Sequence, residues 1–253
     1  MKKIKFVLLP VLLALFMGTP SINAQEIEVH MYRKVAQEDM GEYLKRENTY
    51  WKKFAQSEIE KGNMTFWAVF QRIGGTDLDD SPNILLINSF PDIDKGVNWS
   101  GITDMFPDVK MEDIETNNLS TTTCQLFLTN IGDHIQVENP DFNYVVINYH
   151  SVNNVNTHMT FETEKWKPML QKAMDEGKTR IKGWGHGVLA TVSALDFGYD
   201  TYSYDLYSSL KDAILPPFMN NMEFEPGFFS DMQENYDKGR KATLYRVVSV
   251  ASQ

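Results

Sequence analysis

The sequence predicts an α+β protein made of two tandem ferredoxin-like βαββαβ units. Two observations support this class. The chain repeats itself at an offset of 115 to 118 residues, and each repeat shows strand-like and helix-like segments in the order β-α-β-β-α-β. Such a unit has helices on only one face of its sheet, so the other face must be buried. Two units in one chain can bury these faces against each other, sheet to sheet.

The repeat depends on matched residues in matched order. Trp51 precedes Gly62 by 11 residues, and Trp166 precedes Gly177 by the same interval. Other segments match at a similar offset, namely Trp67 with Trp184, 32–35 with 149–152 and 88–90 with 205–207. Chance does not produce this order and spacing together, so we expect a first unit over residues 25–138 and a second over 139–253.

The elements of the two units are predicted from local pattern. Runs of β-branched and aromatic residues indicate first strands at 26–35 and 142–152. Helical periodicity ending in a glycine indicates helices over 37–61 and 155–176. The remaining elements are strand pairs at 65–73 with 84–90 and 180–193 with 202–207, irregular partly helical segments at 92–118 and 210–239, and last strands at 121–130 and 242–250.

The first 24 residues are predicted to be a cleaved signal peptide, because three lysines precede an apolar stretch and Ala24 precedes Gln25. Without them the chain has 21 basic and 34 acidic residues, a net charge of −13. This charge argues against nucleic-acid binding, which needs clustered positive charge. No later apolar run approaches the roughly 20 residues of a membrane span. The one cysteine, Cys124, lies too far along to carry a lipid, so we expect a periplasmic or secreted protein that is not a lipoprotein.

The order of elements together with the repeated Trp-Gly-Trp pattern resembles the dimeric α/β-barrel superfamily, in a tandem two-unit form. That superfamily includes antibiotic-biosynthesis monooxygenases, haem-degrading monooxygenases and chlorite dismutases. The resemblance spans residues 26–250 and implies an intrachain pseudo-dimeric α/β barrel. It also implies a ligand pocket between a sheet and its helices. No catalytic signature accompanies it, so the resemblance predicts fold more than function.

A carboxylate interrupts the apolar face of the first helix in each unit. Glu47 and Glu162 occupy matching positions, with Tyr43 or His158 one turn before them. A carboxylate that is buried against a sheet must either be paired with a positive charge or have its pKa raised so that it is neutral. One interpretation is therefore that the carboxylate is functional. The alternative is an internal salt bridge that ties the helix to the end of the first strand of its unit, where Arg33 and His150 occupy matching positions.

The second unit has three histidines at positions where the first unit has other residues. His150, His158 and His186 match Arg33, Tyr43 and Val69. With Glu162 they would form a general acid/base pair or a loose metal site. Their spacing matches no established ligand motif, so buried or exposed histidines without such a role are the alternative. The site predicted here comprises Glu162, His150, His158 and His186 as catalytic residues, and Arg33, Tyr43, Glu47, Trp51 and Trp67 as first-unit counterparts.

Three glycines share one face of a predicted strand in the second unit, where the first unit has Phe66, Ala68 and Phe70. We expect an open ligand cavity there, or else larger neighbours that fill the space. The ligand-binding residues predicted on this basis, together with the nearby tryptophans, are Trp166, Gly183, Trp184, Gly185, Gly187, Tyr202 and Tyr204. The alternative for the tryptophans is packing.

These patterns predict an exported protein that binds a small apolar or aromatic molecule in its second unit. As an enzyme it would be a cofactor-free oxygenase or isomerase; a non-catalytic carrier or sensor, or a structural module without a pocket, are alternatives. We expect no cofactor or metal, and haem or a divalent metal is the alternative. The chain could also form a homo-oligomer. The sequence lacks Gly-x-Ser-x-Gly, His-Glu-x-x-His, paired Cys-x-x-Cys and P-loop motifs.

Overall fold

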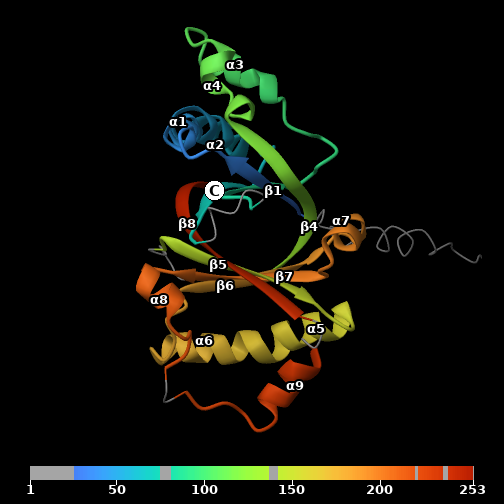
Figure 1. The fold of residues 1–253 in the computed structure, drawn as a ribbon. Coiled ribbons are helices and arrows are strands. Elements are labelled where there is room, and N and C mark those ends of the chain that lie inside the picture. Colours follow the sequence, from blue (N-terminus) through green and yellow to red (C-terminus); the bar gives the residue numbers. More distant parts are fainter. Residues whose placement is uncertain (1–25, 75–80, 137–141, 220–221, 236–238, 253) are drawn as a thin grey trace, which may run out of the picture.

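The fold is an eight-stranded antiparallel barrel with helices on its outside (Figure 1). The computed structural model describes residues 26–74, 81–136, 142–219, 222–235 and 239–252. The predicted signal peptide and the predicted boundary between the units at residue 138 lie outside the described residues. Among those that are described, no helix has the length and apolar character that crossing a membrane requires.

The first half of the chain follows the predicted order of elements. Its elements are β1 (Ile27–Val35), α1 (Met40–Arg46), η1 (Glu47–Trp51), α2 (Lys52–Glu60), β2 (Phe66–Arg72), β3 (Ile84–Phe90), η2 (Trp99–Gly101), α3 (Ile102–Met105), α4 (Met111–Ile114), η3 (Asn117–Leu119) and β4 (Ser120–Gln136). Helices α1 and α2 form one continuous helix through η1.

The second half repeats this order with one additional helix. Its elements are β5 (Tyr144–Ser151), α5 (Val155–Phe161), η4 (Glu162–Trp166), α6 (Lys167–Asp175), β6 (Gly183–Leu189), α7 (Thr191–Phe197), β7 (Thr201–Tyr207), α8 (Leu210–Ile214), α9 (Phe228–Asn235) and β8 (Gly239–Ser252). Helix α7 was not predicted: residues 180–193 were expected to be one strand, but β6 ends at Leu189 and a helix begins at Thr191.

The barrel is closed by pairing between the halves. The strands run in the order β4-β1-β3-β2 and then β8-β5-β7-β6 around the barrel. Strand β2 pairs with β8, and β4 pairs with β6, both antiparallel. The two sheets are therefore joined edge to edge by hydrogen bonds, and the faces expected to pack against each other form the interior of one barrel. Closure also leaves none of the described strands at an unpaired sheet edge.

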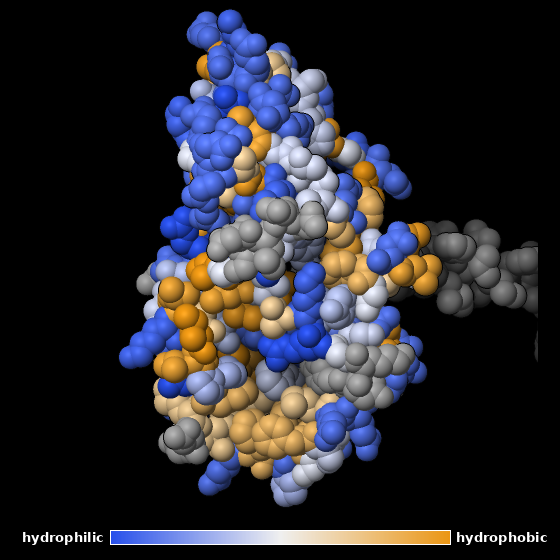
Figure 2. All heavy atoms as spheres, in the orientation of Figure 1, coloured by the Kyte–Doolittle hydropathy of each residue, from blue (hydrophilic) through white to orange (hydrophobic). Residues whose placement is uncertain are grey.

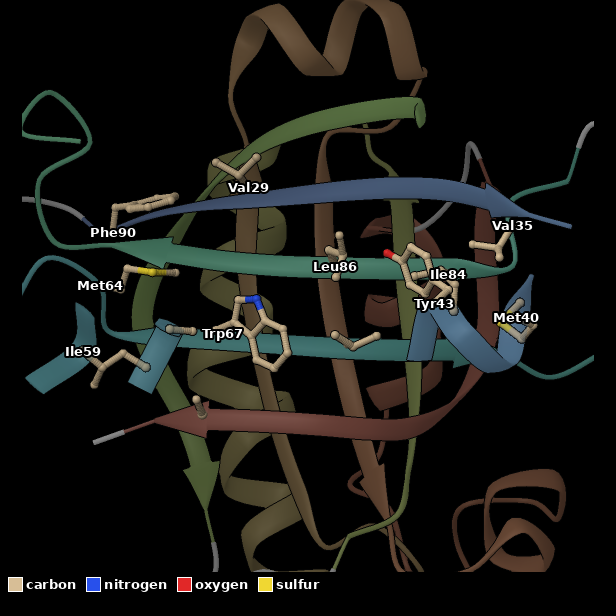
Figure 3. Packing of buried hydrophobic residues seen from close by; sticks show 13 residues of the cluster. Val29, Val35, Met40, Tyr43, Ile59, Met64, Trp67, Ile84, Leu86 and Phe90 are labelled. Carbon is tan, nitrogen blue, oxygen red and sulfur yellow. The ribbon is translucent and has the colours of Figure 1, made fainter. Parts of the chain in front are cut away.

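Among the described residues, apolar layers fill the barrel and separate each half's strands from its long helix, and a smaller cluster holds Phe54, Ile102 and Ile114. The barrel interior contains inward residues of both halves, such as Leu85 and Ile147. A second layer lies between the first half's strands and the α1–α2 helix, where Tyr43 and Trp67 pack (Figure 3). A third lies between the second half's strands and α6, with Trp184 fully buried. Because side chains alternate along a strand, each strand contributes to the interior with one face and to a helix layer with the other.

Candidate functional site

The long helix of each half contains a π-helical turn at the same place. The backbone N–H of Lys52 bonds the carbonyl of Glu47, and that of Lys167 bonds the carbonyl of Glu162, five residues apart in both cases. Such turns are rare and occur frequently at functional sites. Pro168 follows the second turn, but Lys53 occupies the matching position in the first, so proline is not the shared cause. Each turn begins at the carboxylate that the sequence analysis singled out.

The four predicted catalytic residues come together between the second half's sheet and its helix. His158 Nε2 lies 3.8 Å from Glu162 Oε1, and the rings of His150 and His158 are 5.5 Å apart. His186 is close enough for its charge to affect the pKa of His158. All four side chains are at most 3% exposed. The structure thus brings these four residues together, and their catalytic role stays a prediction.

Neighbouring groups orient two of the histidines. His150 Nε2 lies 3.2 Å from the hydroxyl oxygen of Ser203. The ring of His186 stacks on Trp184 with centroids 4.7 Å apart and planes at 28°. Trp184 therefore positions His186, and its complete burial makes it part of the core as well.

Burial favours the uncharged forms of His150, His158 and Glu162. It lowers the pKa of His158 to about 4, with a further contribution from the charge of His186, and it lowers the pKa of His150 to about 2. Burial also raises the pKa of Glu162 well above its usual range, and the nearby Asp205 raises it further. At neutral pH the imidazoles of His150 and His158 are thus uncharged, and burial favours the protonated form of the Glu162 carboxyl beside them.

A chain of polar residues beside the cluster was missed by the sequence analysis. The Asn148 amide donates to Asp205 Oδ2 at 3.1 Å, and Arg240 Nε donates to Asn148 Oδ1 at 3.0 Å. Burial raises the pKa of Asp205 to about 6. Asp205 matches Asn88 in the repeat, and this gain of a carboxyl group in the second half was the available signal.

The first-half counterparts form a different and more closed arrangement. Thr116 donates a hydrogen bond of 2.8 Å to Glu47 Oε1, and Arg33 donates to Asn117. The Arg33 guanidinium also lies over the Tyr43 ring, 6.0 Å from its centroid. The alternative was a salt bridge from this carboxylate to the end of the first strand; among the described residues Glu47 instead accepts a hydrogen bond from Thr116, and Arg33 pairs with Asn117. Trp67 is core, and Trp51 donates from Nε1 to the carbonyl of Ile114.

Glu47 should make the stability of the fold depend on pH. Burial raises its pKa from 4.5 to about 7, so the folded state holds a proton that the unfolded state releases. This contribution is fully present below pH 4.5 and is lost as the pH rises to 7, about 3 kcal/mol in all. We expect Glu47→Gln, which still accepts from Thr116, to flatten the fall in unfolding free energy over that range. Urea unfolding at several pH values measures this, and an unchanged slope would contradict it.

The expected cavity beside the glycines is wrong, because tyrosines occupy the space. Gly183, Gly185 and Gly187 point into the barrel, on the face of β6 opposite Trp184. A Cβ at Gly187 would lie 2.5 Å from Tyr202 Cε1, and one at Gly185 would overlap the Tyr204 ring. The alternative in which larger neighbours fill the gap is therefore the correct one.

The remaining predicted ligand residue, Trp166, lies at the outer edge of the helix layer. It stacks on Phe228 of α9 with ring centroids 6.1 Å apart and contacts Phe218 edge-on at 5.8 Å. Figure 2 shows that hydrophobic residues gather on the lower part of this face of the molecule. Trp166 thus lies in the same helix layer as the histidine cluster, whereas the three glycines face the barrel interior.

Metal ligation finds little support in the geometry. Within the described ranges, no group of three or more His, Cys, Asp and Glu side chains is placed to hold a metal ion. His158 and Glu162 are 3.8 Å apart, and His150 interacts with Ser203. The expectation that the protein is cofactor-free remains a prediction, which visible absorbance and metal analysis of the purified protein would test.

Solved structures with a similar fold are known, although the sequence itself matches no described family. No protein-family model and no curated protein matches the sequence. Among solved structures, a candidate monooxygenase from Lactobacillus acidophilus is 13% identical, with a TM-score of 0.53 over 90% of this chain and 97% of that one. A candidate monooxygenase from Fusobacterium nucleatum is 10% identical, with a TM-score of 0.56 over 92% and 96%.

A third structure, an anthrone oxidase-like protein, is 9% identical, with a TM-score of 0.52 over 91% of this chain and 94% of that one. At such identities the likeness shows the fold alone. Together with the closed barrel and the helices on its outer faces, it confirms the resemblance inferred from the sequence: this chain has the dimeric α/β-barrel fold.

Proposed function

We propose that the protein is an exported, cofactor-free oxygenase that removes a proton from a small aromatic carbon acid and lets the resulting carbanion react with dioxygen. The observation that carries the proposal is the cluster of three buried histidines around the buried carboxyl of Glu162 in the second half, where burial lowers the pKa of His150 and His158 and raises that of Glu162. The first half has Arg33, Tyr43 and Val69 at the matching positions, so the cluster is not a requirement of the fold.

His158 is the best candidate for the base. A neutral imidazole accepts a proton, and the pKa of about 4 makes His158 a stronger base than His150, whose pKa is about 2. Glu162 lies 3.8 Å away, and burial raises its pKa and so favours its protonated form, which can donate a hydrogen bond to the oxygen on which negative charge develops. His186, stacked on Trp184, belongs to the same cluster.

The substrate class follows from the surroundings of this pair. Burial disfavours charge on His150, His158 and Glu162, and Trp166 with the phenylalanines around it offers flat apolar surfaces. A neutral aromatic molecule with an acidic C–H suits such a site better than a charged one. The similar solved structures, named as candidate monooxygenases and an anthrone oxidase-like protein, support oxygen chemistry on such a substrate.

Anthrone is therefore the probe for the first experiment. Its acidic ring CH₂ would become a carbonyl with one oxygen atom of O₂, while the other leaves as water. We expect the mature protein to consume one O₂ per anthrone, with a rate that falls as the pH drops through about 4 and His158 becomes protonated. A rate equal to that in buffer alone would contradict the oxygenase proposal. Saturable anthrone binding without turnover would favour the alternative, a non-catalytic carrier or sensor.

We also propose that the chain is an intrachain pseudo-dimer of two ferredoxin-like units. The same strand order in both halves and the same π-helical turn at Glu47 and Glu162 support it. Export is proposed from residues 1–24, and N-terminal sequencing of the protein from the producing cell should give Gln25 as the first residue. An N-terminus at Met1 would contradict it.

A further inference from the structure

The barrel interior holds a second cluster of buried polar groups, separate from the histidine cluster of the helix layer. Glu28, His30 and Tyr32 extend inward from β1, and Tyr149 and Tyr202 extend inward from β5 and β7. Strands β1 and β5 are four positions apart in the eight-stranded order, so the cluster crosses the barrel. Tyr32 and Tyr149 hold matching positions in the two halves and meet in the middle.

Hydrogen bonds link these groups into one chain that ends at the Glu28 carboxyl group. The Tyr32 hydroxyl donates to the Tyr149 hydroxyl at 2.7 Å, and the Tyr149 oxygen lies 2.8 Å from His30 Nδ1. His30 Nε2 lies 3.3 Å from Glu28 Oε2, which also accepts from Tyr202 at 2.5 Å. The tautomer with its proton on Nε2 satisfies both contacts of His30, because it accepts from Tyr149 and donates to Glu28.

This arrangement specifies what Tyr149 can do. The residue is 1% exposed, and burial raises the pKa of its phenol well above the usual range, so it does not lose its proton alone. Electron loss makes a phenol strongly acidic, and a base in hydrogen-bond contact can then take the proton. His30 is that base, and the imidazolium formed would face the Glu28 carboxylate.

Aromatic rings surround the pair and connect it to the end of the barrel. Phe197, on helix α7, packs edge-on against Tyr149 with ring centroids 5.0 Å apart, and Tyr199 lies 6.2 Å away. Lys241, an exposed residue, has its Nζ 4.8 Å from the centroid of the Phe197 ring. Rings at such spacing provide a route for an electron between the interior and the surface.

We propose that Tyr149 is a redox-active residue that gives one electron to a one-electron oxidant and passes its phenolic proton to His30. The step is balanced: the Tyr149 O–H bond breaks, the oxidant gains the electron, the proton moves to His30 Nδ1, and a neutral tyrosyl radical remains, accepting a hydrogen bond from Tyr32. The class of co-reactant is a one-electron oxidant such as a radical formed in oxygen chemistry. The proposal does not depend on the proposed oxygenase function.

Flash-generated ruthenium(III) tris-bipyridine tests this on the purified mature protein. We expect a neutral tyrosyl radical by visible absorption and electron paramagnetic resonance, with a solvent deuterium isotope effect on its formation. Tyr149→Phe should abolish this radical, while Tyr207→Phe should leave it unchanged, because Tyr207 is equally buried but packs in the helix layer. The same radical in Tyr149→Phe would overturn the assignment.

A second variant tests the role of the base. His30→Gln still offers an acceptor for the Tyr149 hydroxyl but cannot take its proton, so radical formation should slow roughly a hundredfold. Circular dichroism establishes that the variant is folded. For wild-type protein, electron–nuclear double resonance should detect a nitrogen and an exchangeable proton coupled to the radical. A folded His30→Gln variant that reacts at the wild-type rate, or a wild-type radical without these couplings, would overturn the proposal.

Discussion

Replacing His158 by glutamine should lower kcat/KM for anthrone oxidation by roughly 10² to 10⁴, the usual contribution of a general base. Glutamine fills much of the same volume and keeps a hydrogen-bond acceptor, but it takes no proton at accessible pH. Because His158 is 1% exposed and Glu162 Oε1 lies 3.8 Å from its Nε2, no water at the surface can easily replace it. Initial rates of O₂ consumption at several anthrone concentrations measure the change.

The control for this variant is His134→Gln, because His134 is an exposed histidine on β4. It should retain the wild-type kcat/KM. An equal loss of kcat/KM in both variants would mean that replacing any histidine lowers the activity, whatever its position. A His158→Gln variant with wild-type kcat/KM and a wild-type pH profile would remove His158 from the chemistry.

Gly187→Ala should destabilise the barrel by about 3 kcal/mol or more, at the upper end of what overpacking of a core usually costs. The added Cβ would lie 2.5 Å from the backbone oxygen of Thr129 and 2.5 Å from Tyr202 Cε1. Thr129 belongs to β4, whose pairing with β6 closes the barrel, so its backbone cannot move aside without loss of those bonds. Chemical unfolding followed by tryptophan fluorescence measures the free energy.

Gly41→Ala is the matched control for this prediction. Gly41 lies within helix α1, and a Cβ there would meet no atom within 4 Å. Alanine is favoured over glycine inside a helix by up to about 1 kcal/mol, so this variant should be as stable as the wild type or more so. Wild-type stability in Gly187→Ala would show that the interior accommodates the added methyl group.

The fold could be predicted largely because its elements leave periodic patterns. Helical spacing located Glu47 and Glu162 on inward faces, and alternation along a strand located His186 on the same side as Trp184. Helix α7 was missed because the apolar residues before it suggested a longer strand. Gly198, which ends α7 with a φ of 78°, was the signal that could have located it.

Other features could not be predicted because they depend on contacts across the fold. The glycines of β6 indicated missing volume, but whether Tyr202 and Tyr204 turn toward that space is decided by packing. The π-helical turns have no established sequence signal. The contact of His30 with Tyr149 joins residues 119 positions apart, which meet only once the barrel has closed.

The central claim is that the chemistry belongs to the second half, and a comparison of its two matched carboxyl groups tests this most directly. Glu162→Gln and Glu47→Gln make the same change at the same π-helical turn of the two halves. With anthrone and O₂, we predict that Glu162→Gln lowers kcat by roughly a hundredfold or more, while Glu47→Gln leaves it within about twofold of wild type. Unchanged turnover in a folded Glu162→Gln variant, or an equal loss in Glu47→Gln, would contradict the account.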